Sequence, residues 1–225
     1  ERDLDGYEIA SRLSFMFTAS IPDDELWAKA GDGTLKDTEG LRAQAERLID
    51  AKTDVFVQTF MGQWFDFRAF ASSTPGTLER AMYDESWRVL SDVVKEGQPA
   101  SAILQPGFTY INQDLATHYG VVGQFPSDLT RVPMKERGGV LQQGSWLSLS
   151  STPLKTSPIH RGRLVQDRFL CKVIPPPDSA LFEQIQKVYE SIPKTASVKE
   201  RLGSHRKAGA VCAGCHEYMD PIGLG

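Results

Sequence analysis

Cys212-Ala213-Gly214-Cys215-His216 is the stretch of this sequence that constrains its structure most. Two thiols separated by two residues and followed directly by an imidazole form the C-x-x-C-H signature of covalent haem attachment. The spacing matters because both thiols must reach the vinyl groups on one edge of the porphyrin, and the histidine must then lie under the iron. We therefore predict one covalent haem c, with Cys212 and Cys215 as thioether links and His216 as the proximal iron ligand.

Two other chemistries use a C-x-x-C pair. A thioredoxin-type redox site follows a strand in a βαβ unit, whereas a polar helical stretch, 198–207, precedes these cysteines. A structural zinc site needs a second Cys or His pair at ligand spacing, and the sequence offers none. Haem is the favoured interpretation, and redox and zinc sites are the alternatives. The third cysteine, Cys171, is then left without a partner, and we expect it to be a small buried hydrophobic residue.

The composition is that of an ordinary globular chain. Of 225 residues, 40% are hydrophobic and 24% are charged, and 25 basic and 29 acidic side chains leave a net charge of −4. Like charges do not gather in long blocks, so we predict no nucleic-acid partner. Apolar runs stay far below the roughly 18 residues that span a bilayer, so we predict no membrane span in this chain. The length suits one large domain or two small ones.

Helical periodicity dominates the first half of the chain. Ile9, Leu13, Met16 and Phe17 recur at the spacing of one helix face. A second helix is expected to begin at Ser20–Asp24 with Pro22 in its first turn, to carry Leu26, Trp27 and Ala30, and to end at the turn 31–33. Further helices are expected behind Asp37 or Thr38 as far as Ile49, and over 55–67, 78–96 and 111–119, the last ending at Gly120.

Shorter segments follow in the second half. We interpret 121–133, with its Gly, Pro, Ser and Asp residues, as a linker. A second unit then begins with 138–149, turns at 153–158 and continues in a helix over 159–172. The run 175–177 consists of three prolines and is expected to be an extended, stiff spacer. No convincing alternating strand pattern occurs, so the predicted class is mainly α.

Several segments resemble a known family. Tyr7-Glu8-Ile9-Ala10-Ser11-Arg12-Leu13-Ser14, followed by 21–26, is similar to the opening of a helical companion domain of unknown function found in large secreted cytochromes. Gln63-Trp64 and 112–120 match later features of that domain. The second half resembles the planctomycete-type cytochrome c domain that usually follows it, through the segments 137–145, 156–158, 161–162, 205–206, 212–216 and 219–223.

The resemblance implies a mainly α fold with two parts. A helical companion domain of unknown function would occupy residues 1–123, and a small cytochrome c-like helical domain with covalent haem would occupy 134–225. Relatives continue past the Asp-Pro-x-Gly motif into a further stretch and another domain, whereas this sequence stops at Gly225. We therefore expect the cytochrome domain to be truncated at its C-terminus and the chain to be part of a longer protein.

The resemblance also implies an exported c-type cytochrome, without supplying a substrate. The leading hypothesis is an electron-transfer module that carries one electron through its haem, in exchange with a redox partner or with further modules of a longer parent protein. A haem enzyme of peroxidase or oxidase type with an open distal site is one alternative. A haem-stapled structural or interaction module is another. Because this kind of haem attachment takes place on exported chains, we expect a periplasmic, cell-surface or extracellular location.

The sixth iron ligand is left open between several residues. His205, seven residues before Cys212, is a candidate distal ligand or pocket residue, with packing against a haem propionate or helix capping as its other roles. Met219 follows His216 by one helical turn and so belongs on the proximal side. His160 and Met134 are weaker candidates. His118 is expected in the core of the companion domain, and the ligand could also lie beyond Gly225.

Two features next to the motif bear on its tuning. A backbone carbonyl at Asp220-Pro221 is close enough in sequence to accept the second N–H of the His216 ring; alternatively, Pro221 only turns the chain after the haem helix. Lys199, Arg201, Arg206 and Lys207 form a basic cluster before the motif. The cluster would steer an acidic redox partner, hold a propionate or form a solvated helix face.

Overall fold

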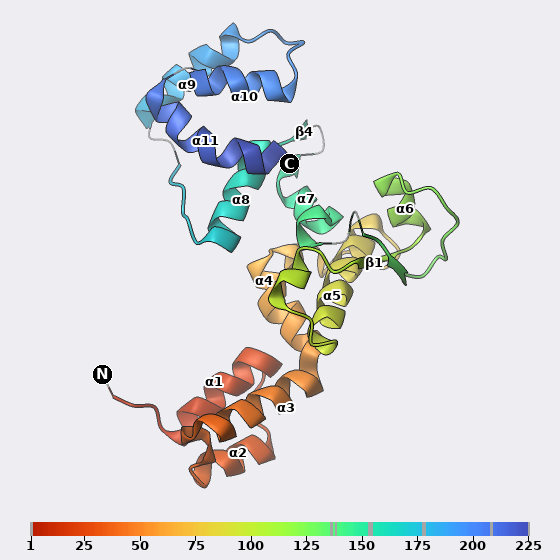
Figure 1. Ribbon diagram of the computed structural model, residues 1–225, viewed down its shortest axis with the longest axis vertical. Coiled ribbons are helices and arrows are strands. Elements are labelled where there is room, and N and C mark those ends of the chain that lie inside the picture. The colour runs from red at the N-terminus through yellow and green to blue at the C-terminus, as the bar shows by residue number, and fades with distance from the viewer. Residues whose placement is uncertain are drawn as a thin grey trace. The chain divides into compact units, whose positions relative to one another are not determined.

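A computed structural model describes residues 2–135, 137, 139–152, 155–176, 179–207 and 209–224. The chain is mainly helical, as predicted, with two short two-stranded sheets (Figure 1). It divides into two compact units, residues 1–146 and 147–225. Each unit is described by itself. The domain bounds predicted from the sequence, 1–123 and 134–225, describe the extent of the two sequence families and stay a prediction.

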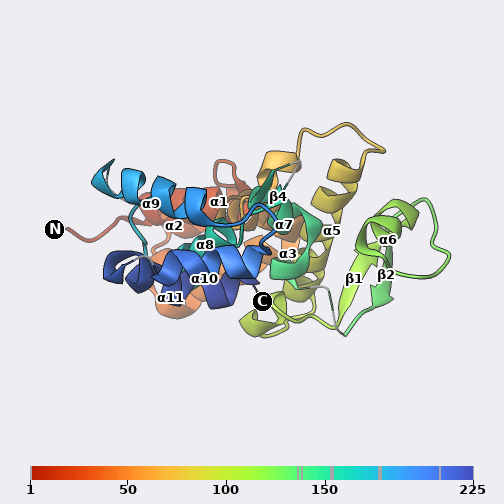
Figure 2. The same cartoon turned by 90° about the horizontal axis from the view of Figure 1, so that it is seen from above.

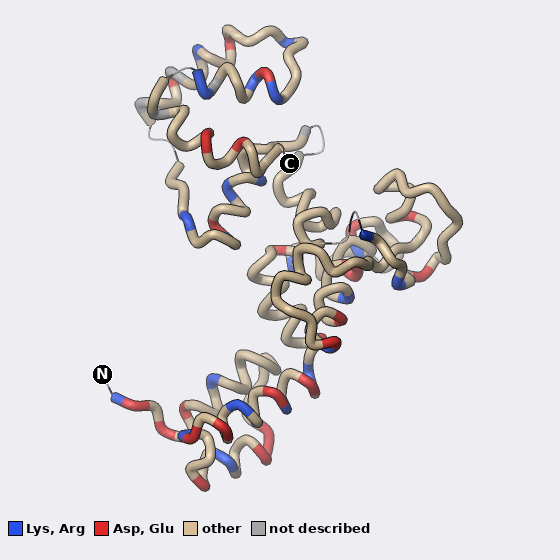
Figure 3. The backbone as a smooth tube through the Cα atoms, viewed as in Figure 1, with Lys and Arg blue, Asp and Glu red and all other residues tan. Residues whose placement is uncertain are grey.

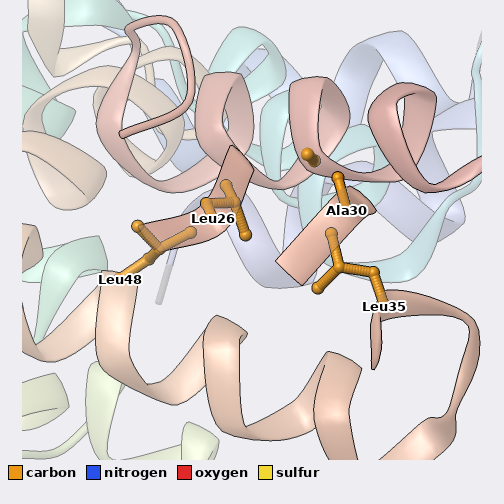
Figure 4. Packing of buried hydrophobic residues seen from close by; sticks show 5 residues of the cluster. Leu26, Ala30, Leu35 and Leu48 are labelled. Atoms are coloured by element: carbon orange, nitrogen blue, oxygen red, sulfur yellow. The ribbon is translucent and has the colours of Figure 1, made fainter. Parts of the chain in front are cut away.

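The first unit begins with three helices around a small apolar core. Helix α1 (Gly6–Thr18) has a capping box formed by Asp5 and Glu8, and α2 (Asp24–Gly31) is capped by the Asp23 carboxylate. A 3-10 turn, η1 (Thr34–Lys36), leads into α3 (Thr38–Phe56), whose N-cap is Asp37. Figure 4 shows four of the buried side chains that these elements share: Leu26, Ala30, Leu35 and Leu48.

Three details of the predicted helices are wrong. Met16 and Trp27 are half-exposed, because α1 turns Ala10 and Ser14 inward and α2 turns Leu26 and Ala30 inward. Pro22 precedes the α2 N-cap and is not in its first turn. The helix expected to begin at 55 is a continuation of α3, which bends at Lys52 (φ −136°), runs on into a π-helical turn, η2 (Val57–Met61), and ends in α4 (Gly62–Trp64).

A long helix and a hairpin form the rest of this unit. The 3-10 turn η3 (Phe67–Phe70) precedes α5 (Leu78–Lys95), and η4 (Ala100–Ile103) follows it. Strand β1 (Phe108–Ile111) pairs antiparallel with β2 (Thr130–Pro133), Phe108 opposite Pro133 and Ile111 opposite Thr130. Between them lies α6 (Gln113–Tyr119), capped by Asn112 and ending at Gly120 in the left-handed conformation.

The hairpin changes two expectations. Ile111 ends a strand and does not begin a helix, since Asn112 takes the N-cap position. The segment 121–133, interpreted as a linker, supplies β2 and packs Phe125, Leu129 and Val132 against Ile111 and Leu115. The physical reason is long-range pairing, which local composition does not report.

The first unit also includes residues 137 and 139–146. They form a 3-10 turn, η5 (Val140–Gln142), and the start of α7 (Gly144–Leu149). Ser145 Oγ lies 2.6 Å from Ser86 Oγ of α5, and the Gly144 N–H donates to the Tyr119 hydroxyl at 2.8 Å. Trp146 is buried, with its ring edge against Phe65. This stretch is therefore part of the core of the first unit.

The second unit is built on four helices. A small antiparallel pair, β3 (Ser151–Thr152) and β4 (Lys155–Thr156), precedes α8 (Pro158–Leu170). Then come α9 (Ser179–Ser191), α10 (Val198–Lys207) and α11 (Ala210–Leu224). Helix α11 packs against α8 and α10, as both views show (Figures 1 and 2). Pro175 and Pro176 lie outside helices and strands, and Pro177 lies outside the described residues.

Candidate functional site

The C-x-x-C-H motif lies in the first half of α11. Counted from Cys212, Cys215 is three residues and His216 four residues further along the helix. These spacings place the side chains of both on the same helix face as Cys212. Cys212 is buried, Cys215 is partly exposed, and both are free thiols. The helix thus brings the three predicted haem-binding residues together without a contribution from another element.

The His216 ring is held by a carboxylate from the next turn of α11. Nδ1 of His216 lies 2.9 Å from Oδ1 of Asp220, and the two side chains are 8% and 1% exposed. The spacing of four residues makes this contact possible within one helix. The sequence analysis expected a backbone carbonyl at Asp220-Pro221 in this role, and the structure places the Asp220 side chain there instead. This contact engages the Nδ1 side of the His216 ring.

Arg206 of α10 approaches the same carboxylate. Its Nε lies 3.5 Å from Oδ2 of Asp220, an oxygen that is buried and accepts no hydrogen bond from the described residues. Arg201 has a different role, since it donates to the carbonyls of Ala196 at 3.0 Å and Lys194 at 2.7 Å. The basic cluster predicted before the motif therefore divides into side chains with separate partners, and Figure 3 shows basic and acidic residues mixed along α10.

Helix α8 fixes the second half of α11. A Cβ on Gly162 would lie 2.1 Å from the Met219 carbonyl oxygen, so only glycine permits this approach. The Gln166 amide donates to the Tyr218 carbonyl at 3.2 Å, and the Arg161 guanidinium donates twice to the Gly223 carbonyl, at 2.9 and 2.6 Å. Pro221 lies inside α11, which continues to Leu224, so the alternative that Pro221 turns the chain after the haem helix is wrong.

The structure sorts the candidates for a sixth iron ligand. The backbone of His205 lies in α10, and its side chain lies outside the described residues. Met219 is buried on α11, one turn after His216. His160 is exposed in the first turn of α8. None of these observations assigns a ligand.

Two other predictions need correction. His118 is exposed on α6 beside the Tyr119 ring, at 5.4 Å between ring centroids, and is not in the core. Met134, a weaker ligand candidate, packs against the apolar cluster of Ile111 and Leu115 in the first unit, and its role as a ligand stays untested. Cys171 is exposed and not buried, because it ends α8 in the left-handed conformation (φ 51°), which turns the chain out of the helix.

The surroundings of the motif are suited to an apolar group. Two large apolar side chains of α11 itself, Tyr218 and Leu224, are exposed, and the second unit also exposes Leu170, Val173, Phe182, Tyr189 and Val198. Within the described ranges, no three His, Cys, Asp or Glu side chains cluster as a metal site, so the zinc alternative gains no support there. Two thiols, an oriented imidazole and uncovered apolar surface fit a covalently attached haem.

The sequence analysis missed the Asp220 carboxylate, although a signal was present. A histidine followed four residues later by an aspartate within a helical stretch places the two side chains one turn apart. Arg206 was identified as basic, but its pairing with Asp220 depends on how α10 and α11 pack, and local sequence does not specify that packing.

Described helices do not include one that is both long and apolar enough to cross a membrane.

Two family models match the chain. Residues 4–121 match the family described as PSD4, protein of unknown function (DUF1592). Residues 137–225 match the family described as PSCyt3, protein of unknown function (DUF1588). No curated protein and no solved structure matches this sequence.

Proposed function

Since the chain belongs to the PSD4 family and carries a PSCyt3 domain in the two-domain arrangement of planctomycete-type cytochromes, we propose that it is an exported c-type cytochrome module that carries one electron. The haem, when bound, supplies an iron that accepts and returns that electron. The proposal rests on one observation above all. Both thiols and an imidazole oriented by a buried carboxylate lie on a single helix, α11.

Each residue of the motif has a distinct task in this proposal. Cys212 and Cys215 would form the two thioether links and so fix the haem edge to α11. His216 would coordinate the iron through Nε2, because its Nδ1 faces Asp220. The packing of α8 on α11 would hold these groups in place while the redox state changes. The second unit would thus supply the attachment, the orientation and an apolar surrounding.

The location follows from the attachment chemistry. Haem is joined to a C-x-x-C-H motif on chains that have been exported, so the protein would work in the periplasm or at the cell surface. Its electrons would pass to or from a redox partner or another module of a longer parent protein. The link between export and attachment can be tested by producing the same chain in one host in two ways, directed to the periplasm or kept in the cytoplasm. We expect covalent haem only on the exported form.

The thiols can be tested one at a time. We expect Cys212→Ala and Cys215→Ala each to lose one thioether link, which leaves one vinyl group of the haem unreacted and shifts the absorption bands of the reduced haem, while the other link still retains it. Cys171→Ala is the matched control, since Cys171 is exposed and lies outside the motif. The measurement is the visible spectrum of the denatured, reduced chain. Absorption bands at the wild-type wavelengths in both motif variants would contradict the proposed attachment.

Carbon monoxide separates electron transfer from catalysis. A sharp low-spin c-type spectrum of the reduced protein that the gas leaves unchanged means two strong protein ligands on the iron. This result supports the electron carrier. A high-spin spectrum, or one that shifts with the gas, means an accessible iron position and favours a haem enzyme. A chain without haem bands, made in a host that attaches haem c, would overturn both.

A further inference from the structure

A buried carboxylate lies behind the candidate iron ligand. Oδ1 of Asp220 is 2.9 Å from Nδ1 of His216, and the Asp220 side chain is 1% exposed. Hydrogen bonds to ionised groups are stronger than those between neutral groups, and a low-dielectric surrounding strengthens them further. The contact between these two side chains is therefore of a different kind from the carbonyl contact expected from the sequence.

The position of the carboxylate is fixed from the neighbouring helix. Gly162 of α8 lies against the Met219 carbonyl, which immediately precedes Asp220, and Gln166 binds the Tyr218 carbonyl at 3.2 Å. Arg161 holds the Gly223 carbonyl on the other side of Asp220. Because contacts lie on both sides along α11, the carboxylate is held where it meets the His216 ring.

The negative charge of Asp220 is only partly balanced by a cation. Arg206 approaches Oδ2 at 3.5 Å, and its side chain is 43% exposed. A guanidinium at that distance and exposure is screened by water. Most of the charge on the carboxylate thus acts on the imidazole, which lies closer and is buried.

We propose that Asp220 is a positioning residue that keeps the proton of His216 on Nδ1 and makes this histidine a stronger electron donor than one bound to a neutral carbonyl. The inference rests on the proposed function. An anionic acceptor raises the basicity of a metal-bound imidazole. A stronger donor stabilises the ferric more than the ferrous state, so Asp220 would lower the reduction potential of the attached haem.

Replacing the charge while keeping the shape tests this role. We expect Asp220→Asn to raise the reduction potential of the attached haem. The matched control is Glu217→Gln, because Glu217 is exposed, adjoins His216 in the sequence and carries the same charge. Redox titration of the full chain measures the potential, and this readout does not depend on a catalytic activity.

Arg206 supplies a test of opposite sign. Arg206→Gln removes the cation beside the carboxylate, so we expect the reduction potential of this variant to be lower than that of the control variant Lys207→Gln. Lys207 is an exposed residue next to Arg206 on α10. If Asp220→Asn takes up no haem, the potential of Arg206→Gln still tests whether the charge of Asp220 affects the iron. Equal potentials within each pair of variants would overturn the inference, while haem bands in the visible spectrum would still support the proposed function. A wild-type chain without haem bands would overturn both.

Discussion

The carboxyl group of Glu85 lies on α5 inside the first unit, between two hydroxyl groups. Thr109 Oγ1 donates to one of its oxygens at 2.6 Å and Tyr119 donates to the other at 2.5 Å, while Glu85 itself is 1% exposed. Burial raises the pKa of Glu85 to about 7, against the opposing effects of both hydroxyls and of Arg137. A residue type that is ordinarily ionised at neutral pH therefore titrates there.

The pH dependence of stability follows from the sign of this shift. The pKa of Glu85 is above its usual value of 4.5 in the folded state, so the folded protein binds the proton more tightly than the unfolded chain. The contribution of Glu85 to stability is then fully present below pH 4.5 and is lost as the pH rises through 7. The shift corresponds to about 3 kcal/mol of unfolding free energy.

Substitution of the carboxyl group should remove this dependence. We expect the free energy of unfolding of Glu85→Gln to be nearly flat between pH 5 and 8, where that of the wild type falls. Glu79→Gln, an exposed position on α5, should keep the wild-type slope. Urea unfolding at several pH values, followed by tryptophan fluorescence, measures both. A wild-type slope in Glu85→Gln would mean that other groups cause the dependence.

At the scale of helices and strands, the sequence predicted those elements whose formation depends on neighbouring residues, such as helix caps and helical apolar spacing. Asp37 was found as a helix start because its carboxylate caps α3 locally, and α5 was found because its apolar residues recur at helical spacing. Strands β1 and β2 were missed. Their pairing joins residues about twenty positions apart, and each strand has only four residues, too few for an alternating pattern to stand out.

The contact of α8 with α11 gives a prediction at the same scale. A Cβ at Gly162 would lie 2.1 Å from the Met219 carbonyl, so Gly162→Ala must push the two helices apart. We expect this overpacking to destabilise the second unit by about 1–3 kcal/mol and to reduce the fraction of chains that carry haem. Gly203→Ala is the control, because nothing lies within 4 Å of its Cβ and alanine favours a helix.

Thermal unfolding followed by circular dichroism, together with the ratio of haem to protein absorbance, measures the effect of these two glycine variants. We expect the unfolding temperature of Gly203→Ala to equal or exceed that of the wild type, and that of Gly162→Ala to be lower than that of the wild type. If both variants matched the wild type, the close approach of α8 to α11 would not be needed for the second unit.

For the whole molecule, the sequence motif places Cys212, Cys215 and His216 within five residues, and the structure places all three on one helix, α11; their attachment to haem stays a prediction. The surroundings of the site were harder to predict. Arg206 and Gly162 meet α11 from other helices, and their roles depend on tertiary packing that no local pattern encodes. The same limit affected the boundary between the two parts. The family matches separate at 121–137, whereas the compact units separate after Trp146.

This difference means that the start of the cytochrome sequence stabilises the helical unit. A Cβ at Gly144 would lie 2.9 Å from both the Met82 side chain and the Tyr119 hydroxyl, inside the first unit. We expect Gly144→Ala to increase hydrogen exchange at the amides of α5 and β1, although Gly144 belongs to the PSCyt3 match. Gly214→Ala lies in the same match, with nothing within 4 Å of its Cβ, and should leave those amides unchanged. Equal exchange in the two variants would place the structural boundary at the family boundary, before residue 137.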